Sequence, residues 1–278
     1  MTDTILVLGG NGKTGRRVAE RLAARGTDIR IGSRSAAIPF DWNDPSTWKA
    51  AVADVSAVYI TYVPDLAVPG APDAVAAFTE TAVGAGVRRL VLLSGRGEVE
   101  AQNAEERLRV VAEGAGAEWT VVRASWFAQN FNENFLIEPI LAGEVALPVG
   151  DVKEPFIDVE DIADVAVAAL TEDGHSGEVY EVTGPRLISF AEAVAEIGTA
   201  TGREIAYVTV PMEAYATVLT EEAGLDGETV GFLTYLFTEV LDGRNAHLSD
   251  GVQRALGREP RDFSDFARDA AATGVWTA

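Results

Sequence analysis

The chain has 278 residues, of which 47% are hydrophobic and 23% are charged, a composition typical of a globular protein with a sizeable core. It contains no cysteine, which excludes disulfides, thiolate metal sites and a cysteine nucleophile. The formal net charge is −21, and a field of that sign repels nucleic-acid phosphates and anionic lipids. We therefore expect no direct binding to nucleic acid or to a membrane.

Short apolar runs alternate with helical patterns through the first half of the chain. Strands are expected at residues 4–8, 28–31, 55–61, 87–93 and 119–123. Helices are expected at residues 12–25, 73–85 and 104–112. Strands that alternate with helices in this way predict an α/β fold, a Rossmann-type doubly wound parallel sheet with helices on both faces.

The regular alternation ends after residue 123. An aromatic segment with scattered prolines follows, and then come a helix at 158–170 and a strand at 179–183 that returns to the sheet. Further helices are expected at residues 189–201, 212–223, 226–241 and 263–271. We therefore predict a Rossmann domain at 1–183, with a substrate-facing insert at about 125–157. A smaller, mainly helical substrate lobe is predicted at 184–278.

No stretch of the sequence reaches the ~18 apolar residues that a membrane-spanning helix needs. No basic leader precedes the first apolar run, so the sequence favours a cytoplasmic protein without a targeting segment. The two histidines, His175 and His247, lie far apart in the sequence, and no carboxylate cluster has the spacing of metal ligands. No metal site is expected.

A glycine-rich loop joins the first expected strand to the first expected helix, and Gly9, Gly12 and Gly15 give it the spacing Gly-x-x-Gly-x-x-Gly. Glycine is needed there because the chain must turn sharply, admit a phosphate against bare backbone and pack the helix closely on the strand. The helix N-terminus then offers N–H groups to a pyrophosphate, which predicts a dinucleotide site. The loop residues are Gly9, Gly10, Asn11, Gly12, Lys13, Thr14 and Gly15.

The type of dinucleotide is indicated at the end of the second expected strand. NAD enzymes usually place a carboxylate there, roughly 20 residues past the loop, for the ribose hydroxyls. This chain has Gly32, Ser33 and Arg34 instead. A serine and an arginine suit a 2′-phosphate, so the sequence favours NADP(H) as the cofactor.

Several segments together resemble the atypical short-chain dehydrogenases of the NmrA-like group. They are Phe40-Asp41-Trp42-Asn43-Asp44-Pro45, Ala57-Val58-Tyr59-Ile60, Leu92-Leu93-Ser94, the stretch 123–131 and the stretch 155–163. Within that group the chain is most similar to the festuclavine dehydrogenase branch of the ergot alkaloid enzymes. One departure is Ala124, which stands where the group usually has proline. The resemblance covers nearly the whole chain and implies a Rossmann-type oxidoreductase.

The resemblance also implies roles for individual residues. The glycine loop would hold the pyrophosphate, Ser33 and Arg34 the adenosine phosphate, and Asp41 and Trp42 would lie near the adenine. The residues that would border the ribose and nicotinamide are Thr61, Tyr62, Val63 and Ser94. The residues that would face the substrate are Trp126, Phe127, Phe131 and Phe156. Each of these four aromatic side chains has core filling as its alternative role.

The chain lacks the Tyr-x-x-x-Lys pair with which ordinary short-chain dehydrogenases protonate a substrate oxygen. Its three lysines are Lys13, Lys49 and Lys153, and the residues four positions before them are Gly, Pro and Val. No catalytic residue is therefore assigned, and Tyr62 is the tyrosine to test first as a proton donor.

Two functions are compatible with an intact dinucleotide loop and a missing lysine. The first is an NADPH-dependent reductase that acts on a small molecule and transfers hydride to an activated electrophile, namely an imine or iminium ion, a quinone or an enone. The second is a redox sensor that binds NADP(H) and acts through a protein partner. A homodimer is compatible with either function.

Overall fold

The structure, a computed structural model, describes residues 4–133 and 135–277 and divides into two compact units. Unit 1 consists of residues up to 124, with 159–182 and 250–259. Unit 2 consists of residues 125–158, 183–249 and 260 onward. The expected insert at about 125–157 groups with the second unit.

Residues 250–259, which the sequence analysis places in the lobe over 184–278, group with unit 1 in the structure. Helix α10 (Gly251–Leu256) begins against strand β8 (Glu178–Val182) of the sheet. A Cβ at Gly251 would lie 2.0 Å from the carbonyl oxygen of Glu181, so the absence of a side chain permits this close approach.

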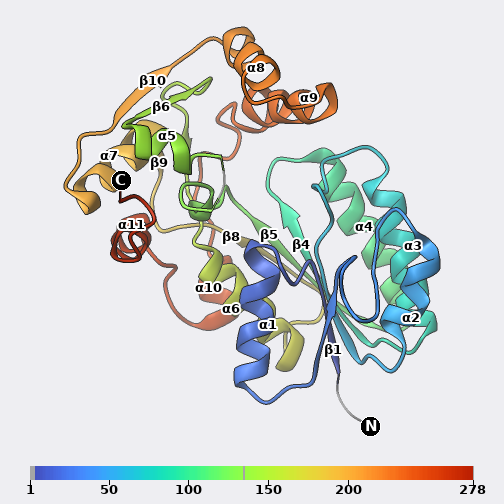
Figure 1. The fold of residues 1–278 in the computed structure, drawn as a ribbon. Coiled ribbons are helices and arrows are strands. Elements are labelled where there is room, and N and C mark those ends of the chain that lie inside the picture. Colours follow the sequence, from blue (N-terminus) through green and yellow to red (C-terminus); the bar gives the residue numbers. More distant parts are fainter. Residues whose placement is uncertain (1–3, 134, 278) are drawn as a thin grey trace. The chain divides into compact units, whose positions relative to one another are not determined.

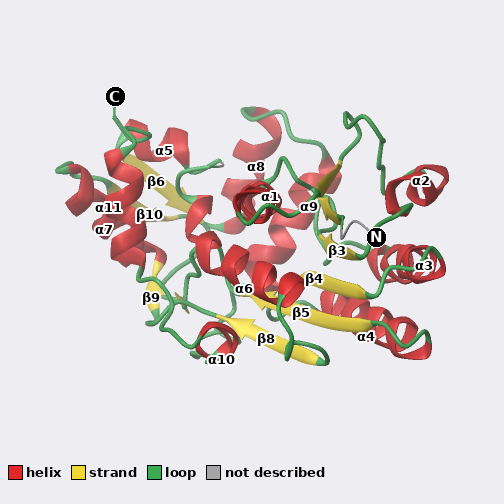
Figure 2. Cartoon of the chain, turned by 90° about the horizontal axis from the view of Figure 1, so that it is seen from below, coloured by secondary structure: helices red, strands yellow, loops and turns green. Residues whose placement is uncertain are grey.

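Unit 1 is built on a parallel sheet of six strands in the order β2-β1-β3-β4-β5-β8. The five strands besides β8 are β1 (Ile5–Leu8), β2 (Ile29–Gly32), β3 (Ala57–Ile60), β4 (Arg89–Gly95) and β5 (Glu118–Ala124). Figure 2 shows β4, β5 and β8 side by side in this sheet. The predicted doubly wound parallel sheet is confirmed.

Helices cover both faces of the sheet (Figure 1). Helices α1 (Lys13–Ala24) and α6 (Val159–Thr171) pack together on one face. Helices α2 (Trp48–Val52), α3 (Ala71–Gly84) and α4 (Val99–Gly114) cover the other. A short 3-10 turn, η1 (Pro45–Thr47), leads into α2. A strand that is covered on both faces needs apolar residues at successive positions, because every side chain is buried. Leu6, Val7 and Leu8 of β1 are accordingly fully buried.

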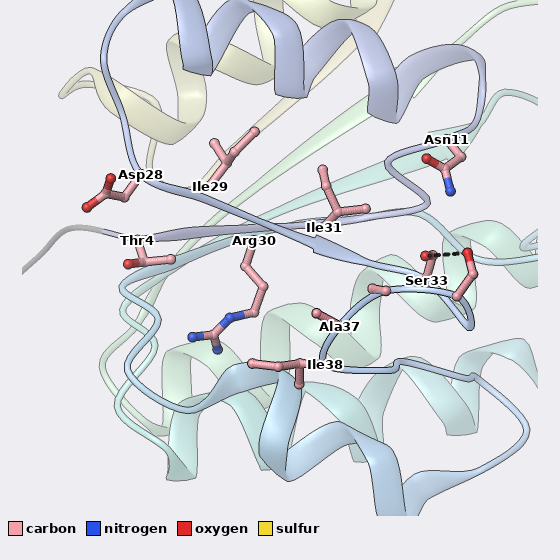
Figure 3. Close-up of a pocket in the computed structure, with 11 residues that line it drawn as sticks. Thr4, Asn11, Asp28, Ile29, Arg30, Ile31, Ser33, Ala37 and Ile38 are labelled. Carbon is pink, nitrogen blue, oxygen red and sulfur yellow. Dashed lines mark hydrogen bonds between the residues drawn. The ribbon is translucent and has the colours of Figure 1, made fainter.

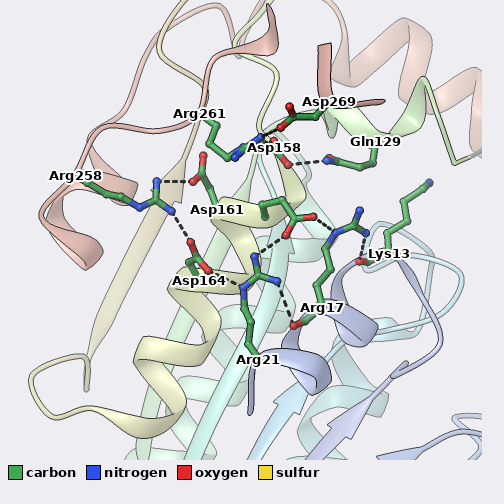
Figure 4. A network of polar contacts seen from close by, with 11 residues as sticks. Lys13, Arg17, Arg21, Gln129, Asp158, Asp161, Asp164, Arg258, Arg261 and Asp269 are labelled. Carbon is green, nitrogen blue, oxygen red and sulfur yellow. Dashed lines mark hydrogen bonds and ion pairs between the residues drawn. The ribbon is translucent and has the colours of Figure 1, made fainter. Parts of the chain in front are cut away.

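Ion pairs fix α6 to its neighbours within unit 1 (Figure 4). On the α1 side, Arg21 donates to Asp164, 2.6 Å away, and also to Glu160. On the α10 side, Arg258 donates to Asp161 over 2.7 Å and to Asp164 over 2.6 Å. The carboxylates of α6 therefore act as structural anchors.

Unit 2 combines helices with two small sheets. Strands β6 (Glu144–Leu147) and β10 (Ala206–Thr209) pair in parallel, and β7 (Lys153–Glu154) pairs antiparallel with β9 (Ile188–Ser189). Its helices are α5 (Ile137–Ala142), α7 (Phe190–Thr201), α8 (Met212–Glu221), α9 (Gly227–Tyr235) and α11 (Phe263–Ala272). Residues 128–130 form a 3-10 turn, η2, and residues 236–240 a π-helix, η3. The small strands were not predicted from the sequence.

The strand order creates a switch point between β1 and β3. The chain leaves β1 toward β2 on one side and then returns to β3 on the other side of β1. In doubly wound sheets, ligands bind in the crevice at the carboxyl ends of the strands at such a point. The carboxyl ends of β1 and β3 lead into the glycine loop and into Thr61 and Tyr62, respectively.

Candidate functional site

The glycine loop turns tightly at the carboxyl end of β1. Gly9 has a φ of +63°, a conformation that favours glycine, and its N–H donates to Gly32 over 3.0 Å. The N–H of Gly12 donates back to the carbonyl of Gly9 over 2.8 Å. A Cβ at Gly9 would lie 2.3 Å from Oγ1 of Thr61, so the loop lies directly against the end of β3.

Helix α1 begins with Gly12 as its N-cap residue, which has no side chain to accept from the first-turn N–H groups. The first turn also contains no acidic residue. The partial positive charge of the helix N-terminus is therefore not neutralised from within its own first turn, which suits an anionic ligand. Asn11 and Gly12 are exposed, whereas Thr14 is buried, so Thr14 can offer its backbone rather than its hydroxyl to a phosphate.

Of the predicted residues after β2, Ser33 lines an open hollow of about 640 Å³ (Figure 3). Asn11 of the glycine loop and Ser33 lie at the same end of it. Arg34 is exposed and forms no ion pair or hydrogen bond with any residue in the described part of the chain. Gly32 is buried, and a Cβ there would lie 2.4 Å from Cδ2 of Leu8. The loop thus presents a polar, cationic edge with no carboxylate between residues 32 and 35.

Asp41 and Trp42 have different environments in the structure. The Trp42 ring is 9% exposed and packs in an aromatic cluster, and its Nε1 donates to the carbonyl of Thr61 over 3.0 Å. The other rings of the cluster are Phe40, Trp48, Phe78 and Tyr62. Asp41 is partly exposed, and its carboxylate accepts from the N–H of Asn43 over 2.9 Å. Trp42 therefore has a structural role, because its buried ring holds the segment that follows β3. Asp41 is the member of the pair that reaches solvent.

The segment after β3 extends the same edge. The Thr61 hydroxyl donates to the carbonyl of Leu8 over 3.1 Å, which ties the ends of β1 and β3 together. The Tyr62 ring lies 4.8 Å from Trp42 between centroids, and burial raises the pKa of its phenol. Val63 is 60% exposed. A raised pKa makes Tyr62 a weaker acid than an ordinary tyrosine, which counts against it as a proton donor.

Ser94, near the carboxyl end of β4, is part of a buried polar network. Its hydroxyl donates to Oε1 of Glu105 over 2.5 Å, and Glu105 also accepts from Arg123 over 2.9 Å. Arg123 donates in turn to Glu181 over 2.8 Å. This network was not predicted from the sequence, because its members lie on β4, α4, β5 and β8 and meet only through the strand order.

The four aromatic residues expected to face the substrate lie in unit 2. Phe131 and Phe156 are 0% and 2% exposed, and their ring centroids are 5.5 Å apart. They pack in an aromatic core with Phe190 and Phe263, which favours core filling, the alternative role that the sequence analysis gives them. Both rings belong to the hydrophobic core of unit 2.

Trp126 and Phe127 are partly exposed and stay candidates. The Trp126 ring packs 5.8 Å from Phe190 and 5.9 Å from Phe237, between centroids. Its indole N–H is buried and has no acceptor among the described residues. A buried donor without an acceptor is uncommon in native structures, so this indole is suited to a ligand oxygen.

The model of an NAD(P)H-binding family matches residues 9–173, which include the glycine loop and the four sheet strands β2, β3, β4 and β5. The chain belongs to this NAD(P)H-binding family. Among residues 4–133 and 135–277, no helix is long and apolar enough to cross a membrane. No group of metal-ligating side chains occurs within the same described ranges.

Relatives of this NAD(P)H-binding chain cover nearly its whole length. It is 32% identical over 289 residues to the uncharacterized oxidoreductase YesF of Bacillus subtilis, with 98% of each chain covered. It is 31% identical over 284 residues to the festuclavine dehydrogenase easG of Aspergillus fumigatus, with 95% of this chain and 96% of the relative covered. The relationship to festuclavine dehydrogenases that the sequence predicts is confirmed.

Solved structures share the fold. The triphenylmethane reductase of Citrobacter complexed with NADP(H) has a TM-score of 0.76 and 18% identity, covering 96% of this chain and 99% of that one. The quinone oxidoreductase QOR2 of Escherichia coli complexed with NADPH has a TM-score of 0.74 and 19% identity, covering 95% and 99%. The chain is thus an NAD(P)H-binding oxidoreductase with a Rossmann-type fold.

Proposed function

We propose that the protein is an NADPH-dependent reductase that transfers hydride to an activated electrophile, such as an imine or iminium ion, a quinone or an enone. The observation that carries the proposal is the end of β2. Arg34 is exposed and unpaired within the described chain, at a position where an NAD enzyme usually has a carboxylate, and its neighbour Ser33 lines the hollow. A planar guanidinium with its donors unused suits a 2′-phosphate.

The chain's own residues would hold the cofactor along the carboxyl ends of β1, β2 and β3. The glycine loop and the start of α1 would bind the pyrophosphate through their backbone N–H groups. Gly12 leaves room for the phosphate, because it has no side chain to occupy that space. Thr61, Tyr62 and Val63 would line the ribose and nicotinamide side. When bound, NADPH supplies a hydride, and the protein contributes orientation and exclusion of water.

The choice of electrophile follows from the missing Tyr-x-x-x-Lys pair. A plain ketone needs a strong proton donor as hydride arrives, and loss of such a donor costs about 10²–10⁴-fold in rate. Iminium ions, quinones and enones are more electrophilic and depend less on protonation. The printed name of one protein with the same fold, an NADPH-dependent quinone oxidoreductase, includes an acceptor of this electron-poor kind.

Trp126 and Phe127 are the proposed substrate contacts. The indole N–H of Trp126 would donate to an oxygen of the substrate, and the aromatic faces would attract an electron-poor or cationic ring.

The test is NADPH oxidation by the purified protein with a cyclic iminium ion, a quinone, an enone and a plain ketone. We expect the first three to be reduced and the ketone to be slowest. Fastest reduction of the ketone would contradict the proposal. Tight NADPH binding without oxidation by any acceptor would favour the redox-sensor function instead.

A further inference from the structure

Residues 126–131 of unit 2 contain the two proposed substrate contacts, Trp126 and Phe127, yet they have little regular structure of their own. The 3-10 turn η2 covers only residues 128–130, and the N–H groups of Asn130 and Phe131 each donate back within the segment over 3.1 Å. A single short turn does not hold two aromatic side chains in place by itself. The positions of Trp126 and Phe127 therefore depend on contacts with the rest of unit 2.

The beginning of this segment is fixed by Ile157. The N–H of Ile157 donates to the carbonyl of Trp126 over 3.0 Å, and the N–H of Ala128 donates to the carbonyl of Ile157 over 2.9 Å. These two bonds form a parallel β-bridge between Phe127 and Ile157. The backbone on both sides of Phe127 is thus tied to one neighbouring residue.

A buried side-chain contact supports the same end of the segment. The amide nitrogen of Gln129 donates to the carboxylate of Asp158 over 2.6 Å, and both side chains are buried. Arg261 donates to the other carboxylate oxygen of Asp158 over 2.7 Å (Figure 4). Residues 126–129 are therefore held through residues 157 and 158.

The end of the segment is fixed by Trp276. The indole Nε1 of Trp276 donates to the carbonyl oxygen of Phe131 over 3.0 Å, and this bond is buried. The ring of Phe131 packs among other phenylalanines, which fixes its side chain, whereas the indole fixes the orientation of the peptide group that follows it. A buried carbonyl without a donor is costly, so the indole stabilises this one orientation of the backbone.

Trp276 is itself held by contacts that do not involve residues 126–131. Its ring packs edge-to-face on Phe266, with the centroids 6.1 Å apart. Arg203 donates to the carbonyl of Trp276 over 3.0 Å and to the carbonyl of Leu141 over 2.7 Å. The indole is therefore a fixed point against which the segment is set.

We propose that Trp276 is a positioning residue for the substrate, because it holds the carbonyl of Phe131 and thereby fixes the segment that presents Trp126 and Phe127. The inference rests on the proposed reductase function and gives Trp276 no contact with the substrate. A segment that is already fixed loses little conformational freedom when the substrate binds, so Trp276 acts on the affinity for the acceptor. The proposed cofactor residues all lie in unit 1, and NADPH binding does not depend on Trp276.

The first test measures amide hydrogen exchange and needs neither cofactor nor acceptor. Trp276→Phe keeps an aromatic ring and removes the indole N–H, so exchange at residues 128–133 should become about fivefold faster or more. Exchange in the glycine loop should not change. Trp119→Phe is the matched control, since it removes a second indole N–H, which donates to Glu113 over 3.2 Å in unit 1. Unchanged exchange at residues 128–133 in Trp276→Phe would overturn the inference.

The second test measures steady-state reduction of a quinone and of a cyclic iminium ion. In Trp276→Phe, the KM for each acceptor that the wild type reduces should rise about fivefold or more, while kcat and the Kd for NADPH stay within about twofold. Ile197→Ala is the control for lost stability, because it removes a fully buried side chain from the same core and no hydrogen bond. Its thermal stability should fall, and its KM values should stay within about twofold of the wild type.

The outcomes separate this inference from the proposed function. An equal rise in KM for Ile197→Ala would show that Trp276 contributes only stability and would overturn the inference. Faster exchange in Trp276→Phe with an unchanged KM would also overturn it, and in both cases the reductase function would stand. A wild-type protein that binds NADPH but reduces no acceptor would contradict the proposed function and the inference together.

Discussion

Gly15, in the first turn of α1, lies so close to Gly9 that a Cβ at Gly15 would be 2.3 Å from the carbonyl oxygen of Gly9. The same oxygen accepts the N–H of Gly12. The glycine loop and the start of α1 therefore pack directly against each other. The glycines of the loop are needed for two different reasons. Gly15 is needed for packing within the protein, whereas Gly12, which is exposed, is available to a ligand.

The two glycines should consequently respond differently to substitution. Gly12→Val should abolish NADPH binding and leave the fold largely intact, because its side chain would enter phosphate space. A Cβ at Gly12 would lie 3.2 Å from the Gly9 oxygen, a contact that a small shift relieves. Gly15→Ala should lower the thermal stability of the protein itself, because its close neighbours are backbone atoms. Calorimetric titration and thermal unfolding of both variants would check this, and normal NADPH binding by Gly12→Val would show that the pyrophosphate lies elsewhere.

Arg34 should set the preference for NADPH over NADH. A charge-assisted hydrogen bond contributes about 1.5–3 kcal/mol, so Arg34→Ala should weaken NADPH binding about tenfold or more and leave NADH binding nearly unchanged. Arg107→Ala, which removes an exposed arginine that pairs with Asp73 on another helix, is the matched control. Equal affinity of the wild type for both dinucleotides would refute the assignment of the 2′-phosphate to this loop.

Tyr62 should contribute to binding of NADPH and not to proton transfer. Its ring packs on Trp42, burial raises the pKa of its phenol, and no lysine stands in the motif position. Tyr62→Phe should therefore keep kcat within about twofold, and Tyr62→Ala should weaken NADPH binding through loss of the ring. A large fall in kcat for Tyr62→Phe at unchanged NADPH affinity would instead make Tyr62 the proton donor.

The buried pair of Glu105 and Arg123 should make a measurable contribution to stability. Glu105 is 6% exposed, and its removal would leave the half-buried Arg123 guanidinium with Glu181 as its remaining carboxylate partner. Breaking a buried pair by removing one member costs about 3 kcal/mol, so Glu105→Ala should lower the free energy of unfolding by about that amount. Glu106→Ala, one residue along the same helix but exposed, should change it far less, because solvent screens exposed ion pairs. A similar small change for Glu105→Ala would mean that the network is held mainly by other contacts.

The sequence predicted the sheet and the glycine loop because both depend on local patterns. Buried parallel strands such as Ile5–Leu8 are continuously apolar, a pattern that is visible in the sequence. The glycine spacing is visible as well, because Gly15 at the start of α1 packs against Gly9 and leaves no room for a side chain. The roles of the aromatic residues were harder to predict, since Phe131 and Trp126 have the same character in sequence and differ only in the tertiary core around them. The buried network of Ser94, Glu105 and Arg123 was missed altogether, because no motif links side chains that neighbouring strands and a helix bring together.

The central claim is that this protein transfers hydride from NADPH to an electron-poor acceptor. The most direct measurement is a single turnover with a cyclic enone and NADPH that carries deuterium on one face of the nicotinamide C4 position, repeated with the label on the opposite face. We predict that one of the two labelled cofactors gives a product with one deuterium on the β-carbon, and that the other gives an unlabelled product. If NADPH binds but neither label reaches the product of an enone, or of any other acceptor that forms a carbon–hydrogen bond, the account is contradicted.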